Sequence, residues 1–410
     1  MKTKTFILIS IILFSLQSCT EKKLVDSNDN NSIDALLFLD GNPVSIEITD
    51  GKIAKIKSFS SKSNLPEIYV APGLIDLQIN GYMGIDFADQ DLTIEGIREA
   101  TKALWKEGVT SYLPTLITAN QESLIKSFTI LSAALDDEEV GVSIPGFHLE
   151  GPYISPVKGF RGAHLEKYIR EPDWNEFIEL QTAANNGIKI ITVAPEMKGA
   201  ISFIENCKAE GIVVSLGHHN GNAQQIKAAA NAGASMATHL GNGCANMINR
   251  HNNPLWPQLA NDRISAGIIV DGFHLNKEEV QTFYKAKGKD RIILVSDALD
   301  LAGLEPGEYI SWERTVLLTE DVVKFPAENV LAGAASPLRA CVGNIMEFTN
   351  CNLADAIQMA SANPAKLIGL DDRGEISEGK RADLILFTIE DGEMIIQKTI
   401  IEGKVVYSKE

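Results

Sequence analysis

Histidines and carboxylates gather at the ends of short apolar runs in this chain. In GFHLEGPYIS, residues 146–155, an apolar run stops at His148, Glu150 and a Gly-Pro pair. Comparable positions hold Gln78, Asn80, Thr115, Glu196, His218, His219, His239, Asp271, His274 and Asp297. A carboxylate and two imidazoles from separate strands are a standard ligand set for one divalent cation, usually zinc, with a position left for water. We expect Glu150, His218 and His239 to form such a site.

Two of these positions have alternatives. His219 follows His218 directly, and because side chains alternate along a strand, only one of the two can face the same side. We expect His218 to be the ligand. Asp297, in LVSDALD, could take a proton from a metal-activated water and pass it to a leaving amine. An aspartate before an apolar run is also a common helix N-cap, so its position alone leaves both roles open.

Eight β-rich runs supply these strand ends, and helical patterns separate most of them. The runs cover residues 68–80, 109–118, 142–152, 188–196, 212–220, 235–243, 265–275 and 291–300. This alternation predicts a (β/α)₈ TIM-like barrel over 71–373, whose active site lies at the carboxyl ends of the strands. A doubly wound sheet is the alternative, but no glycine-rich phosphate fingerprint follows the first strand.

The two ends of the chain share a different texture. Residues 33–70 and 374–410 alternate short apolar strands with Asp-Gly and Glu-Gly turns, which are hairpin signals. We expect them to form one small β-sandwich that the barrel interrupts in the sequence.

The charge balance restricts the partners. The 410-residue chain has a formal net charge of −17, and no dense Lys/Arg run offsets it. This disfavours nucleic acid or an anionic membrane surface as a partner. An anionic substrate would need a local site.

The N-terminus predicts export. Lys2 and Lys4 precede an apolar run that is too short to span a bilayer, and Leu16-Gln17-Ser18-Cys19 resembles a bacterial lipobox. We expect residues 1–18 to be a signal peptide, Cys19 to be lipidated and residues 19–32 to include a tether. The mature protein would then be a lipoprotein facing the periplasm or cell exterior, held to a membrane only through its lipid. A plain signal peptide is the alternative.

Several motifs together resemble one family. In order they are APGLIDLQINGYMG, FHLEGPYIS, GAH, GHHN, THLGN, DGFHL and SDA. Their order and spacing resemble the amidohydrolase superfamily and, within it, the N-acetylglucosamine-6-phosphate deacetylases, over about residues 33–405. Gln78-Ile79-Asn80 stands where many superfamily members have a His-x-His pair, and the fourth strand lacks their lysine. The resemblance therefore implies a single metal.

The resemblance also implies roles for individual residues. Glu150, His218 and His239 would hold the metal, Asp297 would be the acid/base, and His164 would polarise the amide carbonyl. Arg250 would bind phosphate from a neighbouring subunit of a homodimer. The other residues expected near the substrate are Gln78, Ala163, Asn242, Gly243, Asp271, His274, Leu331, Ala332 and Gly333, the last three in a loop.

The implied reaction is hydrolysis of the N-acetyl amide of N-acetylglucosamine 6-phosphate. The chain departs from the family pattern at His219, at 251–254 and at 334–335. Export also separates the protein from a sugar phosphate made in the cytoplasm. An unphosphorylated N-acyl sugar, an N-acyl-D-amino acid or a cyclic amide therefore remains an alternative substrate, and an inactive sugar-binding lipoprotein is an alternative of another class.

Overall fold

The computed structural model describes residues 32–59, 67–311, 314–319, 322–326 and 330–410. The predicted signal peptide and Cys19 lie outside these residues, as does the tether apart from Ser32, which begins the first strand.

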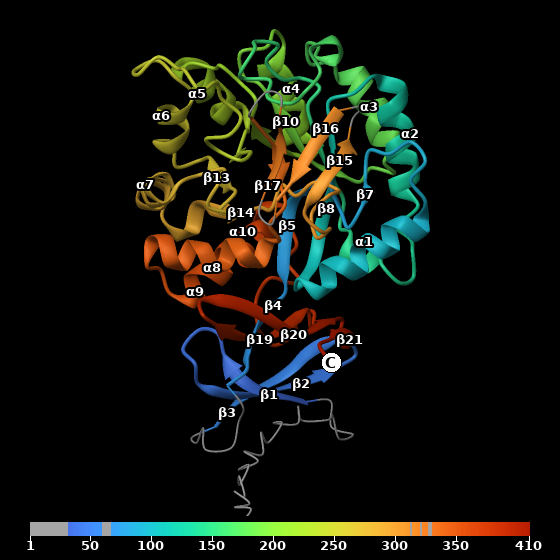
Figure 1. Cartoon of the computed structure of the whole chain (residues 1–410), viewed down its shortest axis with the longest axis vertical. Helices are drawn as coiled ribbons and strands as arrows, with labels where there is room; N and C mark the ends of the chain where they lie inside the picture. Colours follow the sequence, from blue (N-terminus) through green and yellow to red (C-terminus); the bar gives the residue numbers. More distant parts are fainter. Residues whose placement is uncertain (1–31, 60–66, 312–313, 320–321, 327–329) are drawn as a thin grey trace, which may run out of the picture.

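Eight parallel strands form the centre of the molecule, as predicted (Figure 1). They are β5 (Leu74–Ile79), β8 (Val109–Ile117), β9 (Phe147–Glu150), β10 (Ile188–Val193), β11 (Val213–Leu216), β12 (Met236–Ala237), β13 (Ser265–Ile268) and β14 (Ile292–Leu294). Each strand pairs with the next in sequence order. The gap between β14 and β5 is closed just beyond the strand ends, where the Asp297 amide donates to the Gln78 carbonyl at 2.9 Å and the Asn80 amide to the Ala298 carbonyl at 2.8 Å. The (β/α)₈ barrel is confirmed.

Helices surround this barrel. They are α1 (Ile94–Lys106), α2 (Gln121–Ser132), α3 (Trp174–Ala183), α4 (Ala200–Ala209), α5 (Ala223–Ala232), α6 (Leu255–Leu259), α7 (Lys277–Lys287), α8 (Leu338–Thr349), α9 (Leu353–Ala360) and α10 (Ala362–Leu367). The short 3₁₀ turns in the described residues are η1 (Gly141–Ser143), η2 (Glu166–Tyr168) and η3 (Lys289–Arg291). Asn222 and Asn276 begin α5 and α7 with reciprocal capping boxes, which satisfy amides that the first turn leaves free.

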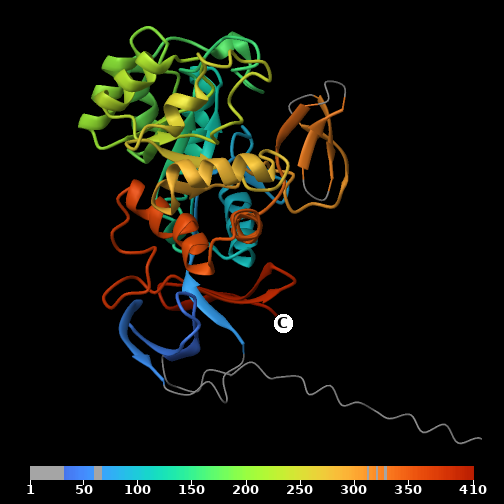
Figure 2. The same cartoon turned by 90° about the vertical axis from the view of Figure 1, so that its left-hand side faces the viewer.

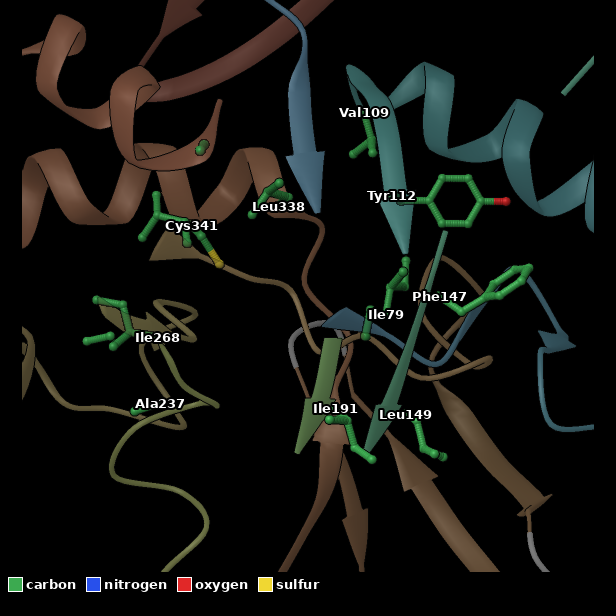
Figure 3. Close-up of a cluster of buried hydrophobic side chains, with 14 of the residues drawn as sticks. Ile79, Val109, Tyr112, Phe147, Leu149, Ile191, Ala237, Ile268, Leu338 and Cys341 are labelled. Carbon is green, nitrogen blue, oxygen red and sulfur yellow. The ribbon is translucent and has the colours of Figure 1, made fainter. Parts of the chain in front are cut away.

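Strand alternation separates the inside of the barrel from its outside. On β9, Phe147 and Leu149 pack into the cluster between strands and helices, which Figure 3 shows in part. His148 and Glu150 therefore point to the interior. The same alternation on β10 places Ile191 in the outer cluster and Ile190 in an inner one.

The first predicted strand is two strands. β4 (Tyr69–Pro72) pairs with β1 and β19 in the small domain, whereas β5 belongs to the barrel. Gly73 lies between them, and a Cβ there would be 2.1 Å from Thr110 Oγ1. The chain crosses between the domains where only a glycine fits.

The two chain ends combine in a small β domain, as predicted. Its strands are β4 together with β1 (Ser32–Leu37), β2 (Pro43–Thr49), β3 (Lys52–Ser58), β19 (Leu384–Glu390), β20 (Glu393–Ile401) and β21 (Lys404–Ser408). They form one hydrogen-bonded sheet in the order β21-β20-β19-β4-β1-β2-β3. Ile46 and Ile53 from the N-terminal side share a core with Leu384 and Ile400 from the C-terminal side.

A four-stranded antiparallel sheet follows β14 and was not predicted. It consists of β15 (Gly307–Ser311), β16 (Arg314–Leu318), β17 (Val322–Phe325) and β18 (Val330–Ala334), and Figure 2 shows it projecting from the side of the barrel. Two shorter strands, β6 (Gly81–Tyr82) and β7 (Ile85–Asp86), form a hairpin after β5. Leu331, Ala332 and Gly333 therefore lie in β18, and their expected placement in a loop is wrong. A bridge between Ala298 and Ala334 fixes this strand beside Asp297.

Candidate active site and metal centre

A cavity of about 1240 Å³ lies at the carboxyl ends of the barrel strands. Among the predicted site residues, those that line it are Glu150, Ala163, His164, His218, His239, Asn242, His274, Asp297, Leu331 and Gly333. Asn80, another of the strand-end residues, also lines it. The cavity thus brings together predicted residues from eight parts of the sequence.

Glu150 is the centre of this site. Its Oε1 lies 2.7 Å from His239 Nε2 and 3.3 Å from His218 Nε2, and it accepts a hydrogen bond of 3.0 Å from Gln78 Nε2. Burial alone would raise the pKa of Glu150, but the hydrogen bonds and charges of His218 and His239 hold it well below its usual value. The carboxylate is therefore an anion at neutral pH.

A third imidazole approaches the same carboxylate. His164 Nε2 lies 4.0 Å from Glu150 Oε2. Within the described residues, the group whose ligand atoms all lie within 4.8 Å of one another is Glu150, His164 and His218. Two of the three predicted ligands, Glu150 and His218, are in this group, and the third, His239, lies beside it with Nε2 2.7 Å from Glu150 Oε1. The described site can thus hold a metal ion.

Hydrogen bonds on the far side of the His218 and His164 rings indicate where each ring carries a proton. His218 Nδ1 lies 3.0 Å from the Phe160 carbonyl oxygen, which can only accept, so Nδ1 is the donor. Its Nε2 faces the Glu150 carboxylate, 3.3 Å from Oε1. A metal-binding histidine has this arrangement, in which the other ring nitrogen donates to a backbone carbonyl. This donor set fits a divalent metal.

His164 has the opposite arrangement. The Thr118 backbone amide donates to His164 Nδ1 at 3.4 Å, and the Thr118 hydroxyl lies 2.8 Å from the same nitrogen. Burial and the neighbouring His218 lower the pKa of His164 to about 3, so the ring is neutral. Its proton is therefore on Nε2, which faces the cavity as a donor.

Asp297 lies at the same mouth. Asn80 Nδ2 donates to its Oδ1 at 2.9 Å. Burial and the negative charge of Glu150 raise the pKa of Asp297 to about 6. This value suits a group that must gain and lose a proton near neutral pH.

Three of these residues have strained backbones. His218, His239 and Asp297 have φ angles of 49°, 28° and 50°, in the left-handed region that few non-glycine residues adopt. Such strain is held in place by its surroundings and concentrates at functional sites.

Comparisons with known proteins agree with this geometry. Residues 69–406 match the model of the amidohydrolase family. The chain belongs to this family. It is 32% identical over 377 residues to the N-acetylglucosamine-6-phosphate deacetylase of Bacillus subtilis, covering 89% of this chain and 93% of that protein. It is 34% identical over 338 residues to the enzyme of that name from Haemophilus influenzae, covering 81% and 85%.

Solved structures show the same likeness. The crystal structure of N-acetylglucosamine-6-phosphate deacetylase from Thermotoga maritima superposes with a TM-score of 0.81 at 31% identity, covering 92% of this chain and 99% of that one. The enzyme of that name from Pasteurella multocida gives 0.81 at 29% identity, covering the same shares. The resemblance proposed from the motifs is confirmed.

Three of the residues predicted at strand ends, His148, His219 and Thr115, do not line the cavity described above. His148 is fully buried, with ring nitrogens facing the Leu77 carbonyl at 3.1 Å and the Thr192 hydroxyl at 2.8 Å, and burial lowers its pKa to about 4. His219 turns away from Glu150 and accepts from the Gly221 amide at 3.1 Å. Thr115 accepts from the Ile79 amide. The choice of His218 over His219 agrees with these contacts.

Some predicted substrate contacts act behind the surface of the cavity. Asp271 Oδ2 lies 2.6 Å from His274 Nδ1, so Asp271 orients His274, which lines the cavity. Gln78 bonds Glu150 as described above. A Cβ on Gly243 would lie 2.7 Å from the His218 backbone nitrogen, so this glycine allows close packing behind the imidazoles.

Arg250 is exposed and does not line the cavity of its own chain. Its backbone carbonyl accepts from Trp256 Nε1 at 2.9 Å.

Two cationic residues in the cavity wall were not singled out from the sequence. Lys158 and Arg161 are the lysine and arginine that line the cavity among the described residues. Arg161 Nη2 pairs with Glu166 at 3.2 Å. Their position within the segment between FHLEGPYIS and GAH could have indicated them, because both motifs were already assigned to the site.

The described residues contain no helix that is long and apolar enough to cross a membrane.

Proposed function

We propose that this chain hydrolyses the N-acetyl amide of N-acetylglucosamine 6-phosphate to give glucosamine 6-phosphate and acetate. The names of its relatives support this substrate. The observation that carries the chemistry is Asp297, whose carboxyl has a pKa raised to about 6 and lines the same cavity as Glu150 and four imidazoles.

We propose zinc as the cation, with Glu150, His218 and His239 as ligands. His164 is the less suitable third ligand because its cavity-facing nitrogen carries a proton. A bound zinc ion would lower the pKa of a water molecule and polarise the amide carbonyl. The anionic Glu150 and the lone pair of His218 supply the donor atoms that such an ion requires.

Asp297 performs the proton transfers in this proposal. Its carboxylate accepts a proton as water attacks the carbonyl carbon, and it then gives that proton to the amine as the C–N bond breaks. Asn80 holds one carboxylate oxygen at 2.9 Å and leaves the other for the reacting water. A group with a pKa near 6 is suited to both steps.

His164 stabilises the charge that develops on the carbonyl oxygen. Its Nε2–H faces the cavity, and Thr118 fixes the ring from behind. A neutral donor that is already oriented needs no rearrangement as the oxygen becomes negative.

The sugar and its phosphate would lie farther out in the cavity. Asn242, His274 and Leu331 line it and are proposed to contact the sugar. Lys158 and Arg161 add positive charge on the same wall. Because Arg250 is exposed and does not line its own cavity, we propose that it reaches the phosphate of a neighbouring subunit in a homodimer.

An acetate-release assay tests this function. Purified protein loaded with zinc should deacetylate N-acetylglucosamine 6-phosphate with a higher kcat/KM than N-acetylglucosamine or an N-acetyl-D-amino acid. Asp297→Asn is the matched inactive control. A higher kcat/KM on either unphosphorylated compound would contradict the proposed substrate, and no hydrolysis of any of them would favour a binding protein.

We also propose that the chain is an exported lipoprotein, anchored through acylated Cys19. The support is the lipobox-like Leu16–Cys19 segment after a basic, apolar start. Wild-type protein expressed with its N-terminus should be recovered in the membrane fraction, and Cys19→Ala in the soluble one. Recovery of unacylated wild type as a soluble protein would contradict the anchor.

A further inference from the structure

A chain of polar side chains crosses the barrel interior directly below the proposed metal site. It begins at His148 on β9 and runs through Thr192 on β10 and Thr238 after β12 to Ser215 on β11. These four residues are at most 2% exposed. They belong to or adjoin the strands that carry Glu150, His239 and His218, whereas the proposed reaction uses none of them.

The Leu77 carbonyl at one end of this hydrogen-bonded network determines the direction of every hydrogen bond in it. The Leu77 carbonyl can only accept, so the 3.1 Å contact requires a proton on His148 Nδ1. Neutral His148 must then accept at Nε2 from the Thr192 hydroxyl at 2.8 Å. Thr192 Oγ1 accepts from Thr238 at 3.1 Å, and Thr238 Oγ1 accepts from Ser215 at 2.7 Å. All five side-chain polar atoms are satisfied.

Residues of this network are sequence neighbours of the proposed metal ligands. His148 precedes Glu150 by two residues on the same face of β9, and Thr238 immediately precedes His239. Gly217, which immediately precedes His218, fits between the two threonines, because a Cβ there would lie 2.8 Å from Thr192 Cγ2 and 3.1 Å from Thr238 Cβ. The ligand-bearing segments therefore meet at these side chains.

We infer that His148, Thr192, Thr238 and Ser215 are positioning residues that fix the spacing of Glu150, His218 and His239 and so set the affinity for the divalent cation. The inference rests on the metal site of the proposed function. Because the network is fully satisfied and directional, removing one hydroxyl leaves a buried acceptor without a donor and frees the strand ends to shift.

Zinc affinity of the folded, metal-free protein tests the inference. Thr192→Val keeps the shape of the side chain and removes the donor to His148. We expect its zinc dissociation constant to rise by about tenfold, the lower end of the range for groups that bond a metal ligand directly, because Thr192 acts through the strands that carry the ligands. Thr192→Ser keeps the hydroxyl and should restore wild-type affinity. Competition with a chelating dye measures this without any assay of activity.

Thr101→Val is the matched control, because Thr101 is also fully buried and bonds the Ile97 carbonyl and the Tyr112 hydroxyl, at 2.7 Å each, away from the site. It should lower the melting temperature as Thr192→Val does but leave zinc affinity unchanged. Equal zinc affinities in wild type and Thr192→Val would overturn the inference.

Long-range ¹H–¹⁵N spectra of histidine-labelled wild type provide a second measurement that needs no variant. They should show His148 as the neutral Nδ1–H tautomer, and an Nε2–H tautomer would overturn the network. Wild type that binds zinc but releases no acetate would contradict the proposed function and leave this inference intact.

Discussion

The barrel contains two layers of polar side chains, and they differ in how completely their hydrogen bonds are satisfied. The lower layer is the network of His148, Thr192, Thr238 and Ser215. The upper layer is the group at the proposed metal site: Gln78, Asn80, Glu150, His164, His218, His239 and Asp297. In the lower layer, from His148 to Ser215, every side-chain nitrogen and oxygen has a partner. In the upper layer, buried atoms that make no hydrogen bond within the described chain include Gln78 Oε1, Asn80 Oδ1 and His239 Nδ1. His218, His239 and Asp297 are also held at positive φ.

This difference in hydrogen bonding distinguishes histidines and hydroxyls that support the structure from histidines and carboxylates that take part in chemistry. Both layers contain histidines at strand ends, and both are buried. A satisfied, unstrained network adds rigidity, whereas unmatched buried polar atoms and backbone strain tend to concentrate where a ligand or a reaction uses them. The lower layer thus holds the upper one in an arrangement that it would not adopt alone.

Removing the charge of Glu150 should have the largest effect. Glu150→Gln keeps the size of the side chain but replaces an anionic ligand with an amide, so we expect metal to be lost and turnover to become undetectable. Elemental analysis and circular dichroism would measure metal content and folding. His148→Gln in the lower layer should weaken metal binding but not abolish it. Full metal occupancy in Glu150→Gln would place the metal elsewhere.

Asp297→Asn should separate metal binding from catalysis. The amide cannot accept a proton, so kcat should fall by about 10²–10⁴-fold while bound zinc and fold remain as in wild type. Steady-state acetate release gives the kinetic result, and metal analysis of the same sample is the control. Turnover near the wild-type value would remove Asp297 from the mechanism.

The sequence predicted the barrel and most of the upper layer, because both depend on local patterns. Apolar runs that end at histidines or carboxylates mark strand ends, and parallel strands bring those ends together. The structure differs from this prediction where contacts between residues far apart in the sequence determine the local structure. The first predicted strand divides at Gly73, where Thr110 on a neighbouring strand leaves no room for a side chain. The β15–β18 sheet interrupts the β/α alternation, and its position depends on the bridge from Ala298 to Ala334.

The roles of individual histidines were harder to predict for the same reason. The orientation of His164 depends on Thr118, which is 46 residues away, and that of His148 depends on Leu77 and Thr192. Residue type and spacing identify candidate ligands, but the partner of the second ring nitrogen determines whether a histidine donates, accepts or binds metal.

Arg250 tests whether function extends beyond the upper layer. If it binds phosphate across a dimer, Arg250→Ala should raise KM for N-acetylglucosamine 6-phosphate at least about tenfold, since charge-assisted hydrogen bonds are worth roughly 1.5–3 kcal/mol each. KM for N-acetylglucosamine should change little. Arg263→Ala is the matched control, because Arg263 is also exposed and bonds Asn231 at 2.8 Å. Equal changes for both sugars would make Arg250 structural.

The smallest expected effect is on stability, and it comes from the cost of ionising the buried carboxyl of Asp297 in the upper layer. Burial and Glu150 raise the pKa of Asp297 to about 6, above its ordinary value of 3.8. Between these values the unfolded chain releases the proton while the folded chain retains it, so stability falls as pH rises from about 4 to about 6 and stays lower above that. Asn at this position removes the penalty.

Metal-free Asp297→Asn should therefore melt roughly 2–5 °C above metal-free wild type at pH 7.5, and the two should converge near pH 4. Differential scanning calorimetry across this range measures the gap. Thr192→Val, in the satisfied lower layer, should be less stable than wild type at both pH values, because it removes a hydrogen bond and relieves no charge. If the difference in melting temperature between Asp297→Asn and wild type does not depend on pH, the surroundings of Asp297 do not disfavour its ionised carboxylate. The contrast between the two layers would then rest on their hydrogen bonds and backbone angles alone.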